Sequence, residues 1–204
     1  MNEPPAKSTV ARHKTAIKRQ SFSLPVKCLL RDGLLDTTRT FFDYGCGHGQ
    51  DIAMLSDMNF GASGWDPVHR PDGERKPADV VNLGYVINVI EDPQEREQVV
   101  RRAWDLCNTA LTVAAQVEFA AAAKVHAFHA DGILMSRGTF QKYYNQYELR
   151  DASSTLYRPG SFARRVFRAA VKWRTGILPA FRRAPLHRGT AIWTGLRIDF
   201  DRWR

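Results

Sequence analysis

The 204-residue sequence has few cysteines and no long hydrophobic run. Cys28, Cys46 and Cys107 lie far apart and lack the short Cys and His spacings of a zinc module, which argues against a disulfide framework and against metal ligands. No segment approaches the ~20 consecutive apolar residues of a membrane span, and the polar N-terminus lacks the apolar centre of a signal peptide. These absences predict a cytoplasmic protein without a membrane span.

Acidic residues are scarce at both ends of the chain. The formal net charge is +9, and residues 1–27 carry 6 basic and 1 acidic side chain. Residues 28–157 carry 12 basic and 18 acidic side chains, whereas residues 158–204 carry 12 and 2. The basic C-terminal segment suits an acidic partner such as nucleic acid, or it is a solvated surface.

The order of the apolar runs predicts an α/β fold. Strands are expected over residues 40–44, 61–65, 78–90 and 110–119, and helices over 51–58 and 93–107. The second helix has a capping-box start, with Asp92 before Pro93 and with Glu95 in the first turn. A β-α-β-β-α-β order is typical of a mainly parallel sheet.

The flanking segments carry weaker patterns. One or two short helices are expected over residues 12–35, interrupted at Pro25 and stopped by Gly33. Further helices are expected over 136–150 and 161–175, and the alternation over 190–200 predicts an antiparallel closing strand. We therefore divide the chain into a basic N-terminal segment and possible lid (1–38), a Rossmann-like core (39–157), and a basic helix with a strand that completes the sheet (158–204).

A glycine-rich loop, Asp43-Tyr44-Gly45-Cys46-Gly47-His48-Gly49, follows the first expected strand. Its three glycines permit a sharp turn and a close approach to a ligand. Gln50 stands where the dinucleotide fingerprint needs Gly or Ala, and the Gly-Lys-Ser/Thr of a P-loop is absent. A second acidic residue, Asp66, ends the next strand.

This combination resembles the class I S-adenosylmethionine (SAM)-dependent methyltransferases. The resemblance implies SAM as cofactor, with the glycine loop under its amino-acid part and Asp66 on its ribose. The residues expected to bind SAM are Asp43, Tyr44, Gly45, Cys46, Gly47, Gly49, Asp51, Trp65, Asp66, Pro67, Asn82, Leu83 and Gly84. Only 12 residues separate Asp66 from Asp79, so the third strand unit of such a sheet is shortened or missing.

Longer blocks, in chain order, resemble the DNA phosphorothioation-associated methyltransferase family. They read RHKTAIKRQSFSLPVK, FDYGCGHGQD, GWDPVHRP, ADVVNLGYVINVIEDPQERE and DGILMSRGTFQKYYNQYELR, and they cover roughly residues 12–150. The resemblance implies a SAM-binding protein linked to DNA sulfur modification, and it leaves the methyl acceptor open.

Catalytic candidates are fewer than cofactor ligands. Methyl transfer depends on alignment, and a general base is needed only when the acceptor arrives protonated. Tyr85, Asn88 and His13 are the candidates we favour, and Glu118, His126 and His129 are further ones. His13, Lys14, Lys18 and Arg19 form either a lid over the cofactor or a solvated helix face.

Three functions fit these residues. The first is a SAM-dependent methyltransferase that acts on a small molecule or a nucleic acid. The second is a small-molecule enzyme that cyclises SAM or transfers its aminobutyrate arm. The third is a non-catalytic SAM-binding or DNA-binding accessory protein.

Overall fold

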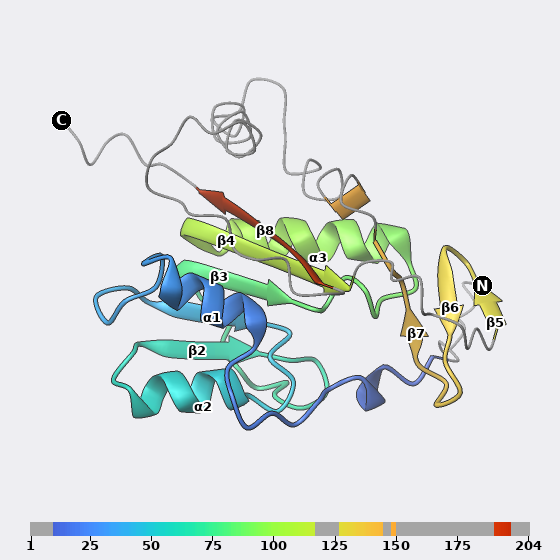
Figure 1. The fold of residues 1–204 in the computed structure, drawn as a ribbon, viewed down its shortest axis with the longest axis horizontal. Coiled ribbons are helices and arrows are strands. Elements are labelled where there is room, and N and C mark those ends of the chain that lie inside the picture. The colour runs from blue at the N-terminus through green and yellow to red at the C-terminus, as the bar shows by residue number, and fades with distance from the viewer. Residues whose placement is uncertain (1–9, 117–126, 145–147, 150–189, 197–204) are drawn as a thin grey trace, which may run out of the picture.

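A five-stranded sheet organises the chain (Figure 1). Figure 1 shows a computed structural model that describes residues 10–116, 127–144, 148–149 and 190–196. The elements in chain order are η1 (Arg12–Lys14), α1 (Leu24–Arg31), β1 (Phe41–Tyr44), α2 (Gln50–Asp57), β2 (Ala62–Trp65), β3 (Ala78–Gly84), α3 (Pro93–Asp105), β4 (Cys107–Gln116), β5 (Ala127–His129), β6 (Gly132–Leu134), β7 (Phe140–Gln141) and β8 (Thr190–Leu196).

The sheet order is β2-β1-β3-β4-β8, with parallel pairs throughout except for the antiparallel pair of β4 and β8. The predicted α/β fold with a Rossmann-like parallel sheet is confirmed, and so are the β-α-β-β-α-β order and the antiparallel strand within 190–200. β3 is shorter than predicted, because the apolar run continues past Gly84 into a loop. The helix expected over 161–175 lies outside the described residues.

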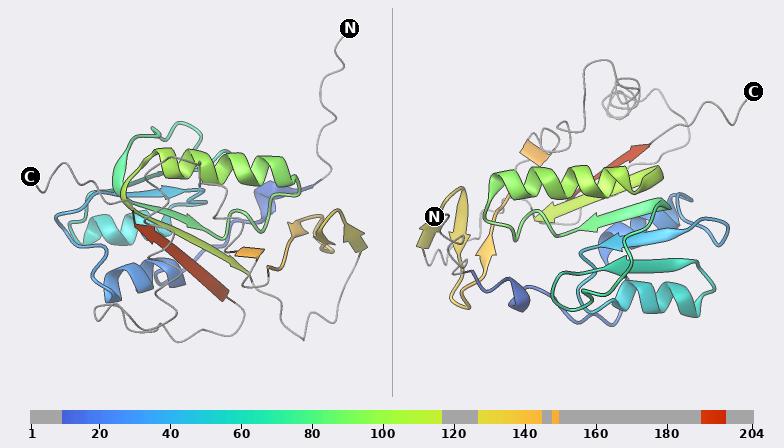
Figure 2. Two further views of the ribbon diagram at one scale, coloured as in Figure 1. Left: turned by 90° about the horizontal axis from the view of Figure 1, so that it is seen from above. Right: turned by 180° about the vertical axis from the view of Figure 1, so that it is seen from behind.

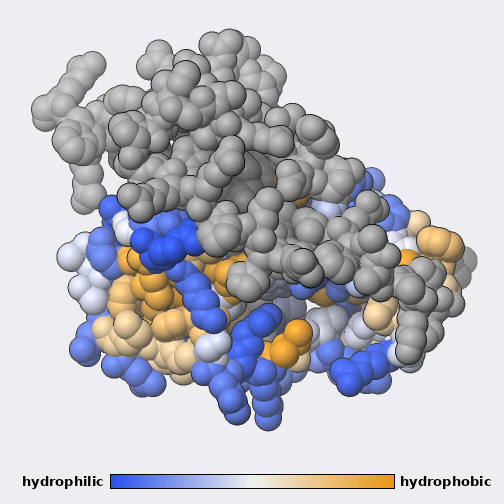
Figure 3. Space-filling model, in the orientation of Figure 1, coloured by the Kyte–Doolittle hydropathy of each residue, from blue (hydrophilic) through white to orange (hydrophobic). Residues whose placement is uncertain are grey.

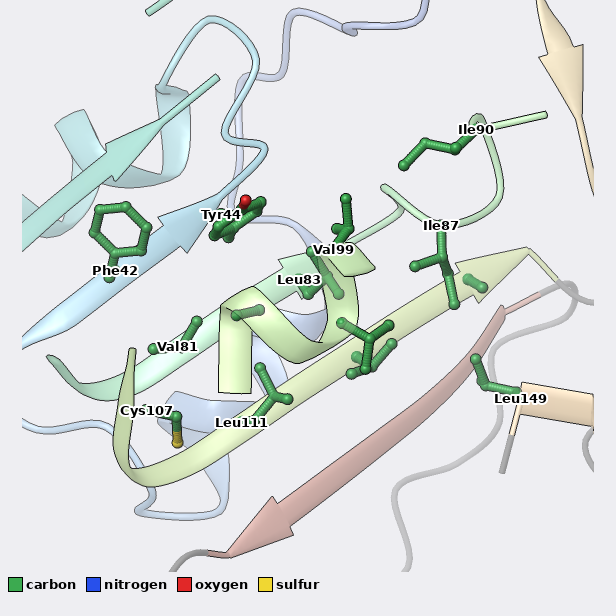
Figure 4. Packing of buried hydrophobic residues seen from close by; sticks show 14 of the residues in the cluster. Phe42, Tyr44, Val81, Leu83, Ile87, Ile90, Val99, Cys107, Leu111 and Leu149 are labelled. Carbon is green, nitrogen blue, oxygen red and sulfur yellow. The ribbon is translucent and has the colours of Figure 1, made fainter. Parts of the chain in front are cut away.

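Helix α3 lies on one face of the sheet and α1 on the other (Figure 2), and a hydrophobic cluster lies on each face. On one face, Phe42, Val81 and Leu111 pack with residues of α3, and Figure 4 shows this cluster. On the other face, the strand residues one position earlier pack with α1 and α2, because successive side chains of a strand alternate between faces. Figure 3 shows hydrophobic residues gathered around α1, where partly buried side chains surround this second cluster.

Helix boundaries follow from capping residues. Pro25 lies in the first turn of α1, where a missing N–H costs nothing, so the predicted interruption at Pro25 is wrong. Gly33 has a φ of 68° and follows the end of α1, as predicted. Asp92 caps α3 by accepting the N–H of Gln94. Glu95 does not close the predicted capping box, because both its carboxylate oxygens accept hydrogen bonds from Arg12.

The segment between β2 and β3 contains no further strand or helix. It folds back on β2, since a Cβ at Gly73 would lie 2.4 Å from the carbonyl oxygen of Gly64. The indole N–H of Trp65 donates to the carbonyl of Pro71 at 3.2 Å. The third strand unit, which was predicted to be shortened or missing, is missing, and this loop covers the end of β2.

A small antiparallel sheet, β5-β6-β7, ends inside the range 136–150 for which a helix was predicted. That prediction is wrong for residues 136–144, where Phe140 and Gln141 form β7, whereas Glu148 and Leu149 are helical. Gly138 has a φ of 73° and turns the chain between β6 and β7. Phe140 is buried against Gly132, where any Cβ would lie 2.5 Å from the ring of Phe140. None of the helices in the described part of the chain is long and apolar enough to span a bilayer.

Candidate functional site

The glycine loop lies at the carboxyl ends of β1 and β2. Gly45, Gly47 and Gly49 have φ values of 85°, 53° and 79°, a conformation that glycine adopts at little cost. The N–H groups of Gly45 and Cys46 both donate to the carbonyl of Trp65, at 2.8 and 3.1 Å. Gly49 is the N-cap residue of α2, so the loop leads directly into that helix.

Gly45 has a second constraint besides its dihedral angle. A Cβ at this position would lie 2.4 Å from Cγ2 of Val86, whereas a Cβ at Gly33 would meet nothing within 4 Å. Gly45→Ala is expected to lower the free energy of unfolding by about 2–4 kcal/mol, and Gly33→Ala by about 1–2 kcal/mol from backbone strain alone. Urea titration of both variants measures the difference, and equal losses would show that Val86 yields without cost.

Asp43, Asp51 and Asp66 converge on this loop from three elements. Asp43 in β1 is buried and accepts a hydrogen bond from Nδ2 of Asn82 at 2.8 Å. Burial, reinforced by the charge of Asp51, raises the pKa of Asp43 to about 7. A cationic ligand at the loop would therefore favour the ionised form of the Asp43 carboxyl group.

The carboxylate of Asp66 connects the glycine loop to the segment that follows β2. Its Oδ2 accepts the N–H of Gly47 at 3.0 Å, and its Oδ1 accepts the N–H groups of Val68 and His69 at 2.9 Å. A carboxylate has about four acceptor positions, so one remains for a ligand hydroxyl. Asp66 thus holds the glycine loop in place while retaining the capacity for the predicted ribose contact.

Cys46 is a poor nucleophile in this setting. Burial raises the pKa of its thiol to about 12, and the nearby carboxylates of Asp43 and Asp66 add to that rise. The protonated thiol contributes bulk to the loop rather than covalent chemistry.

A strap of residues 11–23 crosses the site. At one end, Ala11 donates to the carbonyl of Gly138 at 2.7 Å, and Arg12 makes two hydrogen bonds of 2.7 Å to Glu95 and one of 2.9 Å to Glu91. At its other end, the Ser23 N–H donates to Asp51 at 2.8 Å.

The middle of the strap contacts the glycine loop and its surroundings. A Cβ at Gly47 would lie 3.1 Å from Cβ of Ala16. The guanidinium of Arg19 lies over the ring of Tyr85, 5.6 Å from its centroid. The guanidinium of Arg70 covers Gly49, since a Cβ there would lie 2.4 Å from Nη1 of Arg70. The glycine loop is therefore flanked by two cations as well as by three carboxylates.

The anchor at Arg12 has a direct test. Arg12→Gln is expected to speed trypsin cleavage after Lys18 and Arg19 by about five-fold. The reason is that a bidentate ion pair of this kind adds about 1 kcal/mol to the free energy of local opening of the strap. Lys14→Gln removes an exposed cation of η1 and is the matched control. Equal cleavage rates for the two variants, followed by mass spectrometry, would show that Glu91 and Glu95 do not restrain the strap.

The other predicted cofactor ligands occupy two environments. Tyr44 and Leu83 turn their side chains into the cluster beneath α3, which leaves their backbone for ligand contact. Trp65 packs edge-on against Tyr44 at 5.3 Å, and Arg75 lies 4.7 Å over its ring. Pro67 is exposed, and Gly84 lies against Pro25 at the start of α1.

The catalytic candidates are not brought together. Tyr85 has a φ of 63°, unusual for a bulky residue, and it directly follows β3 beside the strap. Asn88 is buried, and its side-chain Nδ2 donates to Oε1 of Gln141 at 3.4 Å. The backbone carbonyl of Asn88 accepts the N–H of Lys142. His13 is exposed on η1.

Of the further candidates, His129 is exposed on β5, whereas Glu118 and His126 lie outside the described residues. Tyr85 is therefore the best placed of the candidates, and the catalytic roles of Asn88 and His13 stay predictions.

Three polar groups were not singled out in the sequence: Arg12 and Ser23 at the site, and Thr112 in the sheet. Arg12 pairs with residues 79 and 83 positions away, and Ser23 with one 28 positions away. Thr112, fully buried in β4, lies next to Asn82 across the sheet. A polar residue inside an apolar run was the one available signal for Thr112.

The fold is similar to solved structures of methyltransferases. The 1,6-didemethyltoxoflavin-N1-methyltransferase of Burkholderia thailandensis, with bound 1,6-didemethyltoxoflavin and S-adenosylhomocysteine (SAH), aligns with a TM-score of 0.51 and 13% identity over 86% of this chain and 76% of that chain. An O-methyltransferase family protein of the same organism aligns with a TM-score of 0.50 and 15% identity over 85% of this chain and 56% of that one.

These likenesses establish the methyltransferase-like Rossmann fold. No protein-family model and no curated protein matches the chain. The resemblance to the DNA phosphorothioation-associated family therefore stays a prediction from the sequence.

Proposed function

We propose that this protein is a SAM-dependent methyltransferase whose cofactor lies on the glycine loop. The observation that carries the proposal is the arrangement of three left-handed glycines at the carboxyl ends of two parallel strands, flanked by Asp43, Asp51 and Asp66. In open α/β sheets, ligands bind outside the carboxyl ends of the strands. A carboxylate-rich loop suits a cofactor with a sulfonium and an ammonium group, and it would repel the phosphates of a dinucleotide.

The residues present fit such a cofactor. The absence of a Cβ at Gly47 and Gly49 lets Ala16 and Arg70 lie close to the loop. Asp66 keeps one acceptor position for a hydroxyl, and Arg19 offers a cation for a carboxylate. When bound, SAM supplies an electrophilic methyl group. The role of this chain is to position the cofactor and exclude water, because an in-line displacement gains most of its rate from alignment. Tyr85 is the residue that we place nearest the acceptor.

The acceptor class follows from less specific features. The strap carries Lys14, Lys18 and Arg19 on exposed positions, and its described residues include no acidic side chain, so an anionic acceptor is favoured. The sequence resemblance to the phosphorothioation-associated family makes nucleic acid one such acceptor, and an acidic small molecule is the other.

Calorimetry with SAM and SAH tests the proposal, and absence of binding by both would overturn it. Incubation with SAM and analysis by mass spectrometry then separates the activities. SAH formed only in the presence of an acceptor supports methylation. Methylthioadenosine formed without an acceptor supports cyclisation or aminobutyrate transfer, and binding without either product supports an accessory protein. Retention on DNA that weakens with rising salt would support a nucleic-acid acceptor. No retention even at low salt would support an acidic small molecule.

A further inference from the structure

A row of buried polar side chains crosses the sheet at one register. Asp43 in β1 pairs with Asn82 in β3, and Asn82 pairs with Thr112 in β4. Their exposed fractions are 5%, 2% and 0%. The residues two positions earlier in each strand belong to the cluster under α1 and α2, so this row projects toward the same two helices. Burying an ionisable group in a sheet is costly, which indicates that the hydrogen-bonded pair of Asp43 and Asn82 serves the site.

The contacts within the row give Asn82 a defined orientation. Its Nδ2 donates to Oδ1 of Asp43 at 2.8 Å, so its amide oxygen points elsewhere. That oxygen, Oγ1 of Thr112 and Oγ of Ser23 at the start of α1 are buried and have no hydrogen-bond partner within the described part of the chain. The side-chain amide of Asn82 therefore fixes the orientation of the Asp43 carboxyl group through this hydrogen bond.

Titratable and charged groups from four segments lie near Asp43. Asp51 lies on α2, Asp66 follows β2, Arg19 lies on the strap, and the Cys46 thiol belongs to the glycine loop. Burial raises the pKa of Asp43 first, and Asp51 and Asp66 raise it further. Among the groups that lower this pKa, the hydrogen bond from Asn82 acts more strongly than the charge of Arg19.

We propose that Asn82 is a positioning residue that holds the Asp43 carboxylate toward the glycine loop, so that the site prefers the cationic cofactor SAM over its neutral product SAH. The inference rests on the proposed function. SAM carries a net charge of +1 and SAH carries none. Both have an ammonium group, but SAM alone also has a sulfonium, so SAM gains more than SAH from an ionised Asp43. Binding of SAM near neutral pH is then accompanied by release of the Asp43 proton to solvent.

Calorimetric titrations with SAM and SAH between pH 5.5 and 9 test this role. SAM affinity of the wild-type protein is expected to rise with pH and to level off above about pH 7. In Asn82→Leu, the midpoint is expected to move up by at least about one pH unit, with SAM affinity about ten-fold weaker at pH 7 and nearly restored at pH 9. SAH affinity should change much less. Thr112→Val replaces a buried hydroxyl, which has no hydrogen-bond partner among the described residues, by a methyl group and should keep the wild-type midpoint.

Several outcomes would overturn the inference. An unchanged midpoint in Asn82→Leu, or weakening by the same factor at every pH, would show that Asn82 acts only in packing. Failure of the wild-type protein to bind either molecule would instead overturn the proposed function, and this inference with it.

If Asn82→Leu is insoluble, carbon-13 NMR of the wild-type protein provides the measurement, with the Asp43 carboxyl signal assigned through Asp43→Asn. Its titration midpoint is expected to fall when SAM binds, and a midpoint that SAM does not move would contradict the inference.

Discussion

Asp43→Asn is expected to weaken SAM binding by about 100-fold at pH 8 and, at the same pH, to make the protein more stable. The first effect follows because the variant removes the buried carboxylate that we propose to lie beside a cationic cofactor, an interaction of about 2–3 kcal/mol in a partly screened site. The amide of the variant still accepts the hydrogen bond from Asn82, so the local packing is kept. Calorimetry with SAM measures the loss of affinity.

The gain in stability has a specific pH dependence. The pKa of Asp43 is about 7 in the folded chain, against 3.8 for an ordinary aspartate. Between these values the folded protein retains a proton that the unfolded chain has lost, so the free energy of unfolding of the wild type falls as pH rises. The advantage of Asp43→Asn should therefore be small near pH 4, grow toward pH 7 and level off above it, with an upper limit of about 4 kcal/mol.

Thermal unfolding of both proteins at pH 5 and pH 8 checks this dependence, with Asp72→Asn as the control that removes an exposed carboxylate. A stability gain of the same size at both pH values would show that Asp43 does not hold a proton in the folded chain. Full SAM affinity in the variant would remove Asp43 from the cofactor site altogether.

Local patterns were sufficient to predict the core of this fold. The strand, glycine loop and helix over residues 41–57 follow from an apolar run, three glycines and an amphipathic segment that are adjacent in sequence. The capping of α3 by Asp92 and the missing third strand unit were also predictable, the second from the 12 residues between Asp66 and Asp79. These features depend on residues close together in the chain, which is why the sequence was sufficient.

The wrong predictions concern segments that tertiary contacts decide. β5, β6 and β7 are two or three residues long, too short for an alternating pattern, and their pairing depends on Gly138 and on the burial of Phe140. The strap was predicted only as one of two alternatives for a basic segment, because its anchor pairs Arg12 with α3 about 80 positions away. Asn82 was predicted as a cofactor ligand, and its hydrogen bond to Asp43 required the register of β1 and β3.

Asp66→Ala is expected to lose both stability and cofactor affinity, because Asp66 connects the glycine loop to the segment after β2. The variant removes three backbone hydrogen bonds to one carboxylate, from Gly47, Val68 and His69, at a cost of about 3 kcal/mol in the free energy of unfolding. For a domain of this size the midpoint of thermal unfolding should fall by about 6–12 °C.

The binding loss in Asp66→Ala should exceed what its stability loss explains. At a temperature where the variant remains folded, SAM affinity is expected to be about 100-fold weaker, since the loop loses its anchor at Gly47 and the ligand loses one acceptor for a hydroxyl. Asp72→Ala removes an exposed carboxylate of the same loop and should leave both properties unchanged. Wild-type SAM affinity in a folded but destabilised Asp66→Ala would assign this carboxylate to the loop alone and would place the ribose elsewhere on the sheet edge.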